Sequence, residues 1–304
     1  MFQDLRRINH NHEINNQLEE LAHLDAPRLG APRQKAIVYI GVAALMSIMP
    51  YLIAIEPCHK SSGLPANCAQ LTLADLAKLE PTLENIKARM DDWPQINYYA
   101  KYNATLKQPL ANEKRVVFLG DSIFEYWLMP KNGGFFPGKP YINRGISAQT
   151  TPQILLRLRA DVIALKPRAM VLLAGANDIG QNTGPITFEQ FQDNIASMAE
   201  LATIHGIKVV LGSILPTSNY HFDGKDPRGP QTAKRPLDKI RACNAWLKEY
   251  CAKSGFVYID YFSALVDTSG MLKRNLSDDD VHPNRAGYAI MAPLTEKAIA
   301  QALK

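Results

Sequence analysis

The chain has 304 residues, of which 46% are hydrophobic and 21% charged, and its formal net charge is +5 at pH 7. That length can bury one sizeable core and leaves residues for additional segments. The charge is modest and there is no dense stripe of Lys and Arg among aromatic residues, so the composition argues against a nucleic-acid-binding protein.

Residues 1–35 are polar, rich in Asn, Glu and His, and show no strand pattern. We expect them to form a solvated tail on the cytoplasmic side of a membrane, for the reasons given next. His10 and His12 belong to this tail, and we interpret them as solvated side chains rather than as ligands of a metal.

Residues 36–55 contain no charged side chain. Twenty residues of helix span about 30 Å, which is the thickness of the hydrocarbon core of a bilayer. A secretory signal would have a shorter apolar region, closer to the N-terminus, and a small-residue cleavage site. A buried core helix is the alternative, but the polar residues before it could not cover it on all sides. We therefore predict a single transmembrane anchor.

The charges beside this apolar segment predict its orientation. Arg28, Arg33 and Lys35 precede it, whereas Glu56 and Lys60 follow it. Because positive charge is retained in the cytoplasm, residues 56–304 are expected to be periplasmic or extracellular, on a protein of the inner or cell membrane.

Four cysteines have neither the C-x-x-C spacing nor the nearby histidines of a metal site. Cys58 and Cys68 flank a loop and could pair in an oxidising compartment. Cys243 and Cys251 are eight residues apart in a helical pattern. Their Cα atoms are then about 12 Å apart, too far for a disulfide, and both are expected to be small core residues.

Residues 56–112 are expected to join the anchor to the main domain through a loop and short helices. The helical patterns cover 72–79 and 81–90. An aromatic group follows and is more typical of a packing helix than of a binding platform: Trp93, Tyr98, Tyr99 and Tyr102.

From residue 113 to residue 304, strand and helix patterns alternate, which predicts a parallel sheet with helices on both faces. The apolar runs predict strands at 116–119, 141–144, 169–174, 208–213 and 256–260. The amphipathic patterns between them predict helices at 151–165, 188–205 and 237–254. A short helical stretch at 123–127 follows the first strand.

Polar motifs follow several of these strands. They are Gly120-Asp121-Ser122, Asn143-Arg144-Gly145-Ile146-Ser147, Gly175-Ala176-Asn177-Asp178 and, near the C-terminus, Asp279-Asp280-Val281-His282-Pro283. In a parallel sheet these turns share one edge. A hydroxyl, a glycine amide, a side-chain amide and an Asp/His pair at one edge are the parts of a serine acyl-transfer site.

Chemistry suggests a role for each group. His282 is the candidate base for the Ser122 hydroxyl, and Asp279, three residues earlier, can orient the imidazole. The amides of Ser122 and Gly145 and the Asn177 side chain could donate to the oxyanion that forms on a carbonyl. Each element alone has a structural explanation: a turn, a positive φ at Gly145, a cap at Asn177, or a structural histidine. Their order and placement together favour a catalytic site.

With these four motifs in order, the sequence resembles the SGNH (GDSL-type) hydrolases over about residues 90–302. The resemblance implies a three-layer α/β/α, flavodoxin-like fold with a central parallel sheet of about five strands. It implies Ser122 as nucleophile, His282 as base, Asp279 as its partner, and Ser122, Gly145 and Asn177 as oxyanion-hole donors. It implies no metal and no organic cofactor.

Within the family, the stretches 135–140 and 143–147 look like those of bacterial acetylesterases and platelet-activating-factor acetylhydrolase-like members. Ser147 is a poorer nucleophile candidate than Ser122, because the Gly-x-Ser-x-Gly elbow is absent. Two residues depart from the pattern. Phe124 stands where Thr is common and could narrow the entrance or pack beneath the site. Asp280 stands where Gly is common and could raise the pKa of His282 if it lies close, or point to solvent.

The sequence therefore predicts a serine esterase that acts on short acyl esters, such as acetyl groups on a carbohydrate. Phe124 and Trp127 are tentative substrate-binding residues, with core packing as the alternative, and Phe135 and Phe136 share that ambiguity. The expected partners are a small-molecule or glycan ester and, through residues 36–55, a membrane. A membrane-tethered O-acyltransferase acting on an envelope glycan, or a lysophospholipase-like lipid esterase, is the alternative function. The sequence does not set the oligomeric state.

Overall fold

The structure is a computed structural model that describes residue 87, residues 90–227 and residues 229–304. The predicted tail, the apolar segment 36–55, the pair Cys58 and Cys68 and the helical pattern at 72–79 lie outside these residues, so they stay predictions. No helix in the described ranges is both long and apolar enough to cross a membrane.

A sheet of five parallel strands forms the centre of the described domain, as the alternating pattern predicted. The strand order is β2-β1-β3-β4-β5, which is the flavodoxin-like order. The strands β1 and β3 are buried along their whole length, which explains their continuous apolar runs. The bounds are β1 Val116–Gly120, β2 Tyr141–Gly145, β3 Ala169–Leu173, β4 Lys208–Gly212 and β5 Val257–Ile259.

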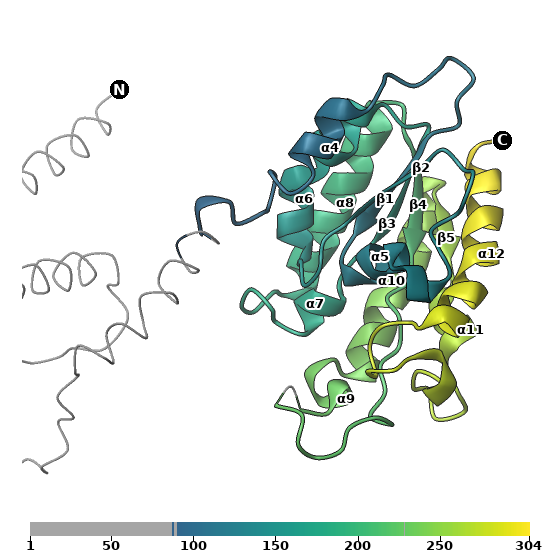
Figure 1. Cartoon of the computed structure of the whole chain (residues 1–304). Coiled ribbons are helices and arrows are strands. Elements are labelled where there is room, and N and C mark those ends of the chain that lie inside the picture. Colours follow the sequence, from purple (N-terminus) through teal and green to yellow (C-terminus); the bar gives the residue numbers. More distant parts are fainter. Residues whose placement is uncertain (1–86, 88–89, 228) are drawn as a thin grey trace, which may run out of the picture. The chain divides into compact units, whose positions relative to one another are not determined.

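Successive side chains of each strand point to opposite faces of the sheet, and each face has its own apolar core. Val117 and Leu119 of β1 pack with α6, α8 and α10, whereas Val116 and Phe118 pack with α5, α11 and α12. Figure 1 shows α6 and α8 on one side of the sheet and α12 on the other. The bounds are α5 Ser122–Glu125, α6 Thr151–Asp161, α8 Phe188–Ile204, α10 Leu237–Ser254, α11 Tyr261–Leu265 and α12 Arg285–Ala302. The short helices are α4 Ala100–Thr105, α7 Ala176–Ile179 and α9 Gln231–Lys234.

The helices predicted at 151–165, 188–205 and 237–254 are confirmed with changes at their ends, whereas the pattern at 81–90 lies outside the described residues except at 87 and 90. Thr150 and Thr187 begin α6 and α8 as capping boxes, each with a glutamine three residues later. The predicted helix 151–165 breaks after Asp161 and ends in a separate 3-10 turn, Ile163–Leu165. No helical pattern predicted α12, in which Gly287 and Pro293 are poor helix formers. Cys243 and Cys251 are buried in the core with free thiols, as expected.

The aromatic group before the first strand divides into packed and exposed side chains. Tyr99 is buried, and its hydroxyl donates to the carbonyl oxygen of Gly145. The Arg144 guanidinium lies over the Tyr99 ring, 4.6 Å from its centre. Trp93 and Tyr98 are instead 39% and 49% exposed. This segment thus packs on the end of β2 and still presents aromatic surface.

A buried cation, Arg157, ties together the strand ends that carry the site. Its guanidinium pairs with Asp161 at 2.9 Å and is fully buried. It also donates to the carbonyl oxygens of Gly120 and Arg144, each at 2.7 Å, and to the side chain of Gln149 at 2.6 Å. Burial lowers the pKa of Arg157, and Asp161 opposes that effect. The carboxyl ends of β1 and β2 are therefore fixed relative to α6.

Candidate active site

Ser122 lies where the interior strand β1 turns into α5. Gly120 allows this turn, because a Cβ there would lie 2.4 Å from the carbonyl oxygen of Leu173. Asp121 caps the helix, since its Oδ1 accepts a 2.9 Å hydrogen bond from the Ile123 N–H. β1 is the strand on whose two sides the strand order runs in opposite directions. Ligands of open α/β sheets bind at the carboxyl end of such a strand.

The structure brings Ser122 together with His282 and Asp279, although 160 positions separate the serine from the histidine. The Ser122 Oγ lies 2.8 Å from Nε2 of His282, and Nδ1 of the same ring lies 2.6 Å from Oδ2 of Asp279. A carboxylate accepts the Nδ1 proton, which leaves Nε2 free to accept the serine proton. This geometry can generate a serine nucleophile.

The turn that carries His282 is held by Asp279 itself. Its Oδ1 accepts hydrogen bonds from the backbone N–H groups of Val281 and His282, at 3.1 and 2.8 Å. Burial alone raises the pKa of Asp279, but the hydrogen bond and charge of His282 and the two backbone N–H groups hold the pKa well below its usual range. The ring of Tyr126 lies 4.6 Å from the imidazole and forms one wall beside it.

Asp121 is a second carboxyl group beside the site, and it is buried. Burial raises the pKa of Asp121 to about 6, although the Ile123 N–H and the nearby His282 and Arg235 oppose that shift. Its Oδ2 lies 3.3 Å from Nδ2 of Asn177. Asp121 therefore links the serine turn to the turn that follows β3.

Asn177 lies at the start of α7, after β3, and every polar atom of its side chain is engaged. Nδ2 donates to the Gln149 carbonyl oxygen at 3.0 Å and approaches Asp121 at 3.3 Å. Its Oδ1 accepts from Asn182 and from Arg235, at 3.0 and 3.2 Å. The amide is thus firmly oriented beside Asp121 of the serine turn, and an oxyanion bound there would compete with the long contact to Asp121.

Gly145 has a different role from the one its motif suggested. Its N–H already donates to the Asn143 side chain at 2.9 Å. A Cβ at Gly145 would lie 2.4 Å from the Glu125 nitrogen and 2.6 Å from the Asp121 oxygen. Gly145 is therefore required by the close approach of β2 to α5, and its N–H is already paired with the Asn143 side chain.

Ala148 is a residue that the sequence did not indicate. It has a positive φ of 65°, which is uncommon for any residue but glycine. Its carbonyl oxygen accepts from Asn182, the residue that also contacts Asn177. Among the described residues, no acceptor is paired with the backbone N–H of Ala148 or of Ser122. No signal in the sequence could have identified Ala148, because alanine has no preference for this conformation.

Phe124 and Trp127, the tentative substrate-binding residues, lie in the core instead. Both are almost fully buried, and their ring centres are 6.5 Å apart. Trp127 stacks on Tyr288 at 4.8 Å. Phe124 therefore packs beneath the site and does not narrow its entrance. Among the residues that the structure describes, the Ser147 hydroxyl contacts the hydroxyl of Tyr126 and no imidazole.

Asp280 neither contacts His282 nor points to solvent, contrary to both expectations for it. It has a φ of 70°, and its side chain is buried. Its Oδ1 lies 2.6 Å from the Ser218 Oγ and 3.1 Å from Nδ1 of His221, and its Oδ2 accepts from the His221 N–H. Asp280 thus fixes the loop after β4 to the turn that carries His282.

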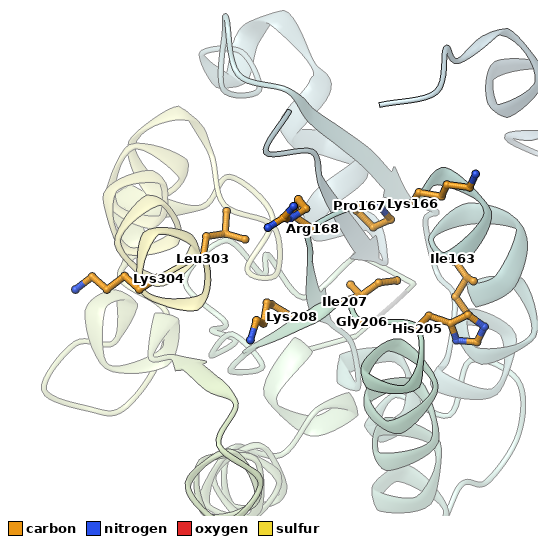
Figure 2. A pocket seen from close by; sticks show the side chains of 10 residues that line it. All are labelled: Ile163, Lys166, Pro167, Arg168, His205, Gly206, Ile207, Lys208, Leu303 and Lys304. Atoms are coloured by element: carbon orange, nitrogen blue, oxygen red, sulfur yellow. The ribbon is translucent and has the colours of Figure 1, made fainter. Parts of the chain in front are cut away.

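Two cavities lie at opposite edges of the sheet. One, of about 710 Å³, lies at the edge where β3 and β4 begin, around Arg168 and Lys208. Figure 2 shows that the cationic side chains there point in different directions, so they do not converge on a ligand. The other is a cleft of about 1000 Å³ whose wall includes Ser147, Ala148 and Asn182, and it therefore adjoins the site. Within the described ranges, no group of three or more His, Cys, Asp or Glu residues is placed to hold a metal ion.

Comparison with known proteins agrees with this architecture. A protein of Bacteroides fragilis named as a candidate acylhydrolase is 39% identical, with 70% of this chain and 99% of that chain covered and a TM-score of 0.64. A GDSL-like lipase of Bacteroides thetaiotaomicron is 40% identical, with 69% and 99% covered and a TM-score of 0.62.

An uncharacterised lipoprotein of Bacillus subtilis, YqeF, is 31% identical over 78 residues, which are 25% of this chain and 32% of that protein. The match thus spans about a third of the lipoprotein. Residues 118–290, more than half of the chain, match the GDSL-like Lipase/Acylhydrolase family. The chain belongs to this family of ester hydrolases.

Proposed function

We propose that this protein hydrolyses carboxylic esters through an acyl-enzyme formed on Ser122. The observation that carries the proposal is the continuous hydrogen-bonded series from Ser122 Oγ through the His282 ring to Asp279, with distances of 2.8 and 2.6 Å. The same three residue types in this geometry form the serine acyl-transfer site of unrelated folds.

In the first half of the reaction, the Ser122 oxygen attacks the ester carbonyl while Nε2 of His282 takes the hydroxyl proton. The tetrahedral intermediate collapses, the bond to the alcohol oxygen breaks, and the imidazolium returns the proton to the leaving alcohol. In the second half, His282 deprotonates a water molecule that attacks the acyl-serine. The carboxylic acid leaves and the serine hydroxyl is restored. Asp279 stabilises the imidazolium in both halves, since its low pKa keeps it ionised.

The oxyanion is proposed to bind two backbone N–H groups, those of Ser122 and Ala148, together with the Asn177 amide. The two backbone groups are favoured because both lack an acceptor among the described residues. One such donor contributes about 3–4 kcal/mol to transition-state stabilisation. The positive φ at Ala148 supports this role, since strained backbone is concentrated at functional sites.

The acyl group is proposed to be short, such as acetyl. The burial of Phe124 and Trp127 supports this, because the two large apolar side chains next to the serine turn are used by the core and do not line a groove for a long acyl chain.

The test is hydrolysis of p-nitrophenyl esters of increasing acyl length by the purified full chain. We expect kcat/KM to be highest for acetate and to fall steadily toward octanoate, and we expect Ser122→Ala to abolish turnover. Turnover by the Ser122→Ala variant at the wild-type rate would overturn the assignment of the nucleophile. A maximum at octanoate would overturn the short-acyl proposal alone.

We also propose that residues 36–55 anchor the protein with residues 56–304 outside the cytoplasm. The support is the uncharged twenty-residue run and the basic residues that precede it. A relative is named a lipoprotein, which is consistent with a membrane-associated ester hydrolase. Carbonate washing of membranes should leave the full chain in the pellet. Release into the supernatant would contradict a spanning anchor.

A further inference from the structure

The cleft beside the site is lined mainly by neutral polar side chains and by two exposed aromatic rings. It has a volume of about 1000 Å³, and its lining includes Trp93, Asn97, Tyr98, Gln181 and Asn182. Pockets of this size are large enough for an extended small ligand. The segment 92–98, which comes before the first strand of the sheet, therefore forms part of a cavity that also reaches Ser147 and Ala148.

The available hydrogen-bonding groups in this cleft are uncharged. In the described part of the chain, the Trp93 indole N–H and the side-chain amides of Asn97 and Gln181 have no partner. These groups include both donors and acceptors. An aromatic face beside paired donors and acceptors suits a ligand that has both C–H surfaces and many hydroxyl groups.

The charges at the cleft do not favour an anionic or cationic ligand. The lining residues that carry charge are Asp92 and Lys234. Both oxygens of Asp92 accept backbone N–H groups, from Ile96 at 2.8 Å and from Asn97 at 2.9 Å. Lys234 also has an interaction partner. The lining lacks the aliphatic side chains that a lipid chain would need. A neutral, hydroxyl-rich ligand fits best.

The cleft is joined to the site by fixed contacts. The Tyr98 hydroxyl donates to Oε1 of Glu125 at 2.6 Å, and Oε2 of Glu125 accepts from the Ser147 N–H at 2.7 Å. On the other wall, Asn182 donates both to the Ala148 carbonyl and to Asn177. A ligand in the cleft would therefore extend directly from the position where the ester carbonyl meets the Ala148 N–H.

The turn that presents the aromatic residues is rigid. Asp92 caps it, and Gln95 occupies a positive φ of 55° within it. Buried Gln149 and Gln153 hold it from below, because their side chains donate to the carbonyl oxygens of Pro94 and Trp93, at 2.9 and 2.7 Å. Trp93 is thus placed over the cleft before any ligand arrives, which lowers the entropic cost of binding.

We infer that this cleft binds the alcohol portion of the ester and that this portion is a neutral oligosaccharide. The inference rests on the proposed ester hydrolysis at Ser122, whose acyl group would then be attached to a sugar hydroxyl.

The test compares O-acetylated xylotetraose and O-acetylated chitotetraose with glycerol triacetate, which carries the same acyl group on a small acyclic alcohol. The full chain should have a kcat/KM at least tenfold higher on one of the acetylated oligosaccharides than on glycerol triacetate. The ratio of the two kcat/KM values should fall at least tenfold in Trp93→Ala and in the double variant Asn97→Ala/Gln181→Ala. Tyr102→Ala is the matched control, since Tyr102 is an exposed tyrosine of α4 that does not line the cleft, and it should keep the preference.

Two outcomes would overturn the inference but leave ester hydrolysis intact. The first is an equal kcat/KM on all three substrates. The second is that Trp93→Ala, with an unchanged melting temperature, loses as much activity on glycerol triacetate as on the sugar esters. A separate binding measurement tests the oligosaccharide site even if the hydrolase proposal fails. Calorimetric binding of unacetylated xylotetraose or chitotetraose to Ser122→Ala should be seen and should be lost on adding Trp93→Ala, even if no ester is hydrolysed. Absence of binding by both sugars would contradict the oligosaccharide assignment.

Discussion

Asp280 holds Ser218 rather than its neighbour in sequence, His282. The Oδ1 of Asp280 lies 2.6 Å from the Ser218 Oγ, and the Ser218 N–H donates to the Asp280 carbonyl oxygen at 3.0 Å. Two adjacent carboxylates, Asp279 and Asp280, therefore serve different loops. Asp279 orients His282, and Asp280 fixes the segment after β4 to the turn that carries His282.

The role of Asp279 predicts that the same substitution has different effects at Asp279 and at its neighbour Asp278. Asp279→Asn cannot stabilise an imidazolium and favours the wrong ring tautomer, so we expect kcat on p-nitrophenyl acetate to fall by about 10³–10⁴. Asp278→Asn is the matched control, because Asp278 is exposed and contacts the Asn284 side chain. It should change kcat by less than about threefold, since surface substitutions are usually within 0.5 kcal/mol. Comparable losses in both variants would contradict the role of Asp279.

Asp280→Ala should act on stability more than on chemistry. It leaves the Ser218 hydroxyl and the His221 N–H without their buried acceptor, and each unsatisfied group costs about 1–3 kcal/mol. We expect the free energy of unfolding to fall by about 2–3 kcal/mol in urea titrations. Asp91→Asn removes a carboxylate from an exposed pair with Lys87 and should change the unfolding free energy by less than about 0.5 kcal/mol. A loss of stability no greater than that of Asp91→Asn would show that Asp280 does not fix the loop.

Gly145→Ala tests the packing role of Gly145. An added Cβ would meet backbone atoms of Glu125 and Asp121 at 2.4 and 2.6 Å, and backbone cannot move aside cheaply. We expect the unfolding free energy to fall by about 3 kcal/mol. Gly180→Ala is the control, because its Cβ would lie 3.3 Å from its nearest contact and its φ is −73°. If Gly145→Ala were as stable as the wild type, the packing explanation would be wrong.

The pH dependence of stability should carry a contribution from Asp121. Its pKa is raised by burial to about 6, so the folded protein holds a proton that the unfolded chain releases near its ordinary pKa, about 4. Stability from this group is therefore fully present below about pH 4, falls as the pH rises to about 6, and changes no further above that, by roughly 3 kcal/mol in total. Asp178, whose pKa burial also raises, and Arg235 lie near enough to modify its size.

Asp121→Asn should remove this contribution, since the amide still caps Ile123 but does not titrate. The measurement is the unfolding free energy of both proteins between pH 4 and 7. The difference between wild type and variant should change between about pH 4 and 6 and be constant from about pH 6 to 7. Parallel curves would show that Asp121 ionises with an ordinary pKa.

The parts of this fold that follow from sequence are those with local causes. The apolar runs of β1 and β3 predict buried strands, and parallel strands place their following turns at one edge, so the proximity of Ser122 to the turn with His282 could be predicted. The side chain of Asp280 could not be, because its partners lie about sixty residues earlier. Gly145 was ambiguous, since a glycine can serve close packing or a free amide and the sequence does not distinguish them.

The role of Ala148 could not be predicted from the sequence. Its conformation leads to the unusual prediction that a substitution by glycine raises the unfolding free energy. Alanine at a φ of 65° is strained, and glycine has no such cost there. Ala148→Gly should therefore raise the unfolding free energy by about 0.5–1 kcal/mol, the strain relieved less the added freedom of the unfolded chain. Ala242→Gly is the matched control. Ala242 is exposed in the interior of α10, so the same change should lower stability by about 1 kcal/mol.

The activity of Ala148→Gly should stay within about threefold of the wild type, because the backbone N–H proposed to bind the oxyanion is kept, whereas losing one such donor costs about 10²–10³ in kcat. Opposite signs of the two stability changes, with activity retained, are the expected result. A loss of stability in Ala148→Gly as large as that in Ala242→Gly would mean that the positive φ is not the native conformation of this turn, and the Ala148 N–H would then lose its place in the oxyanion hole.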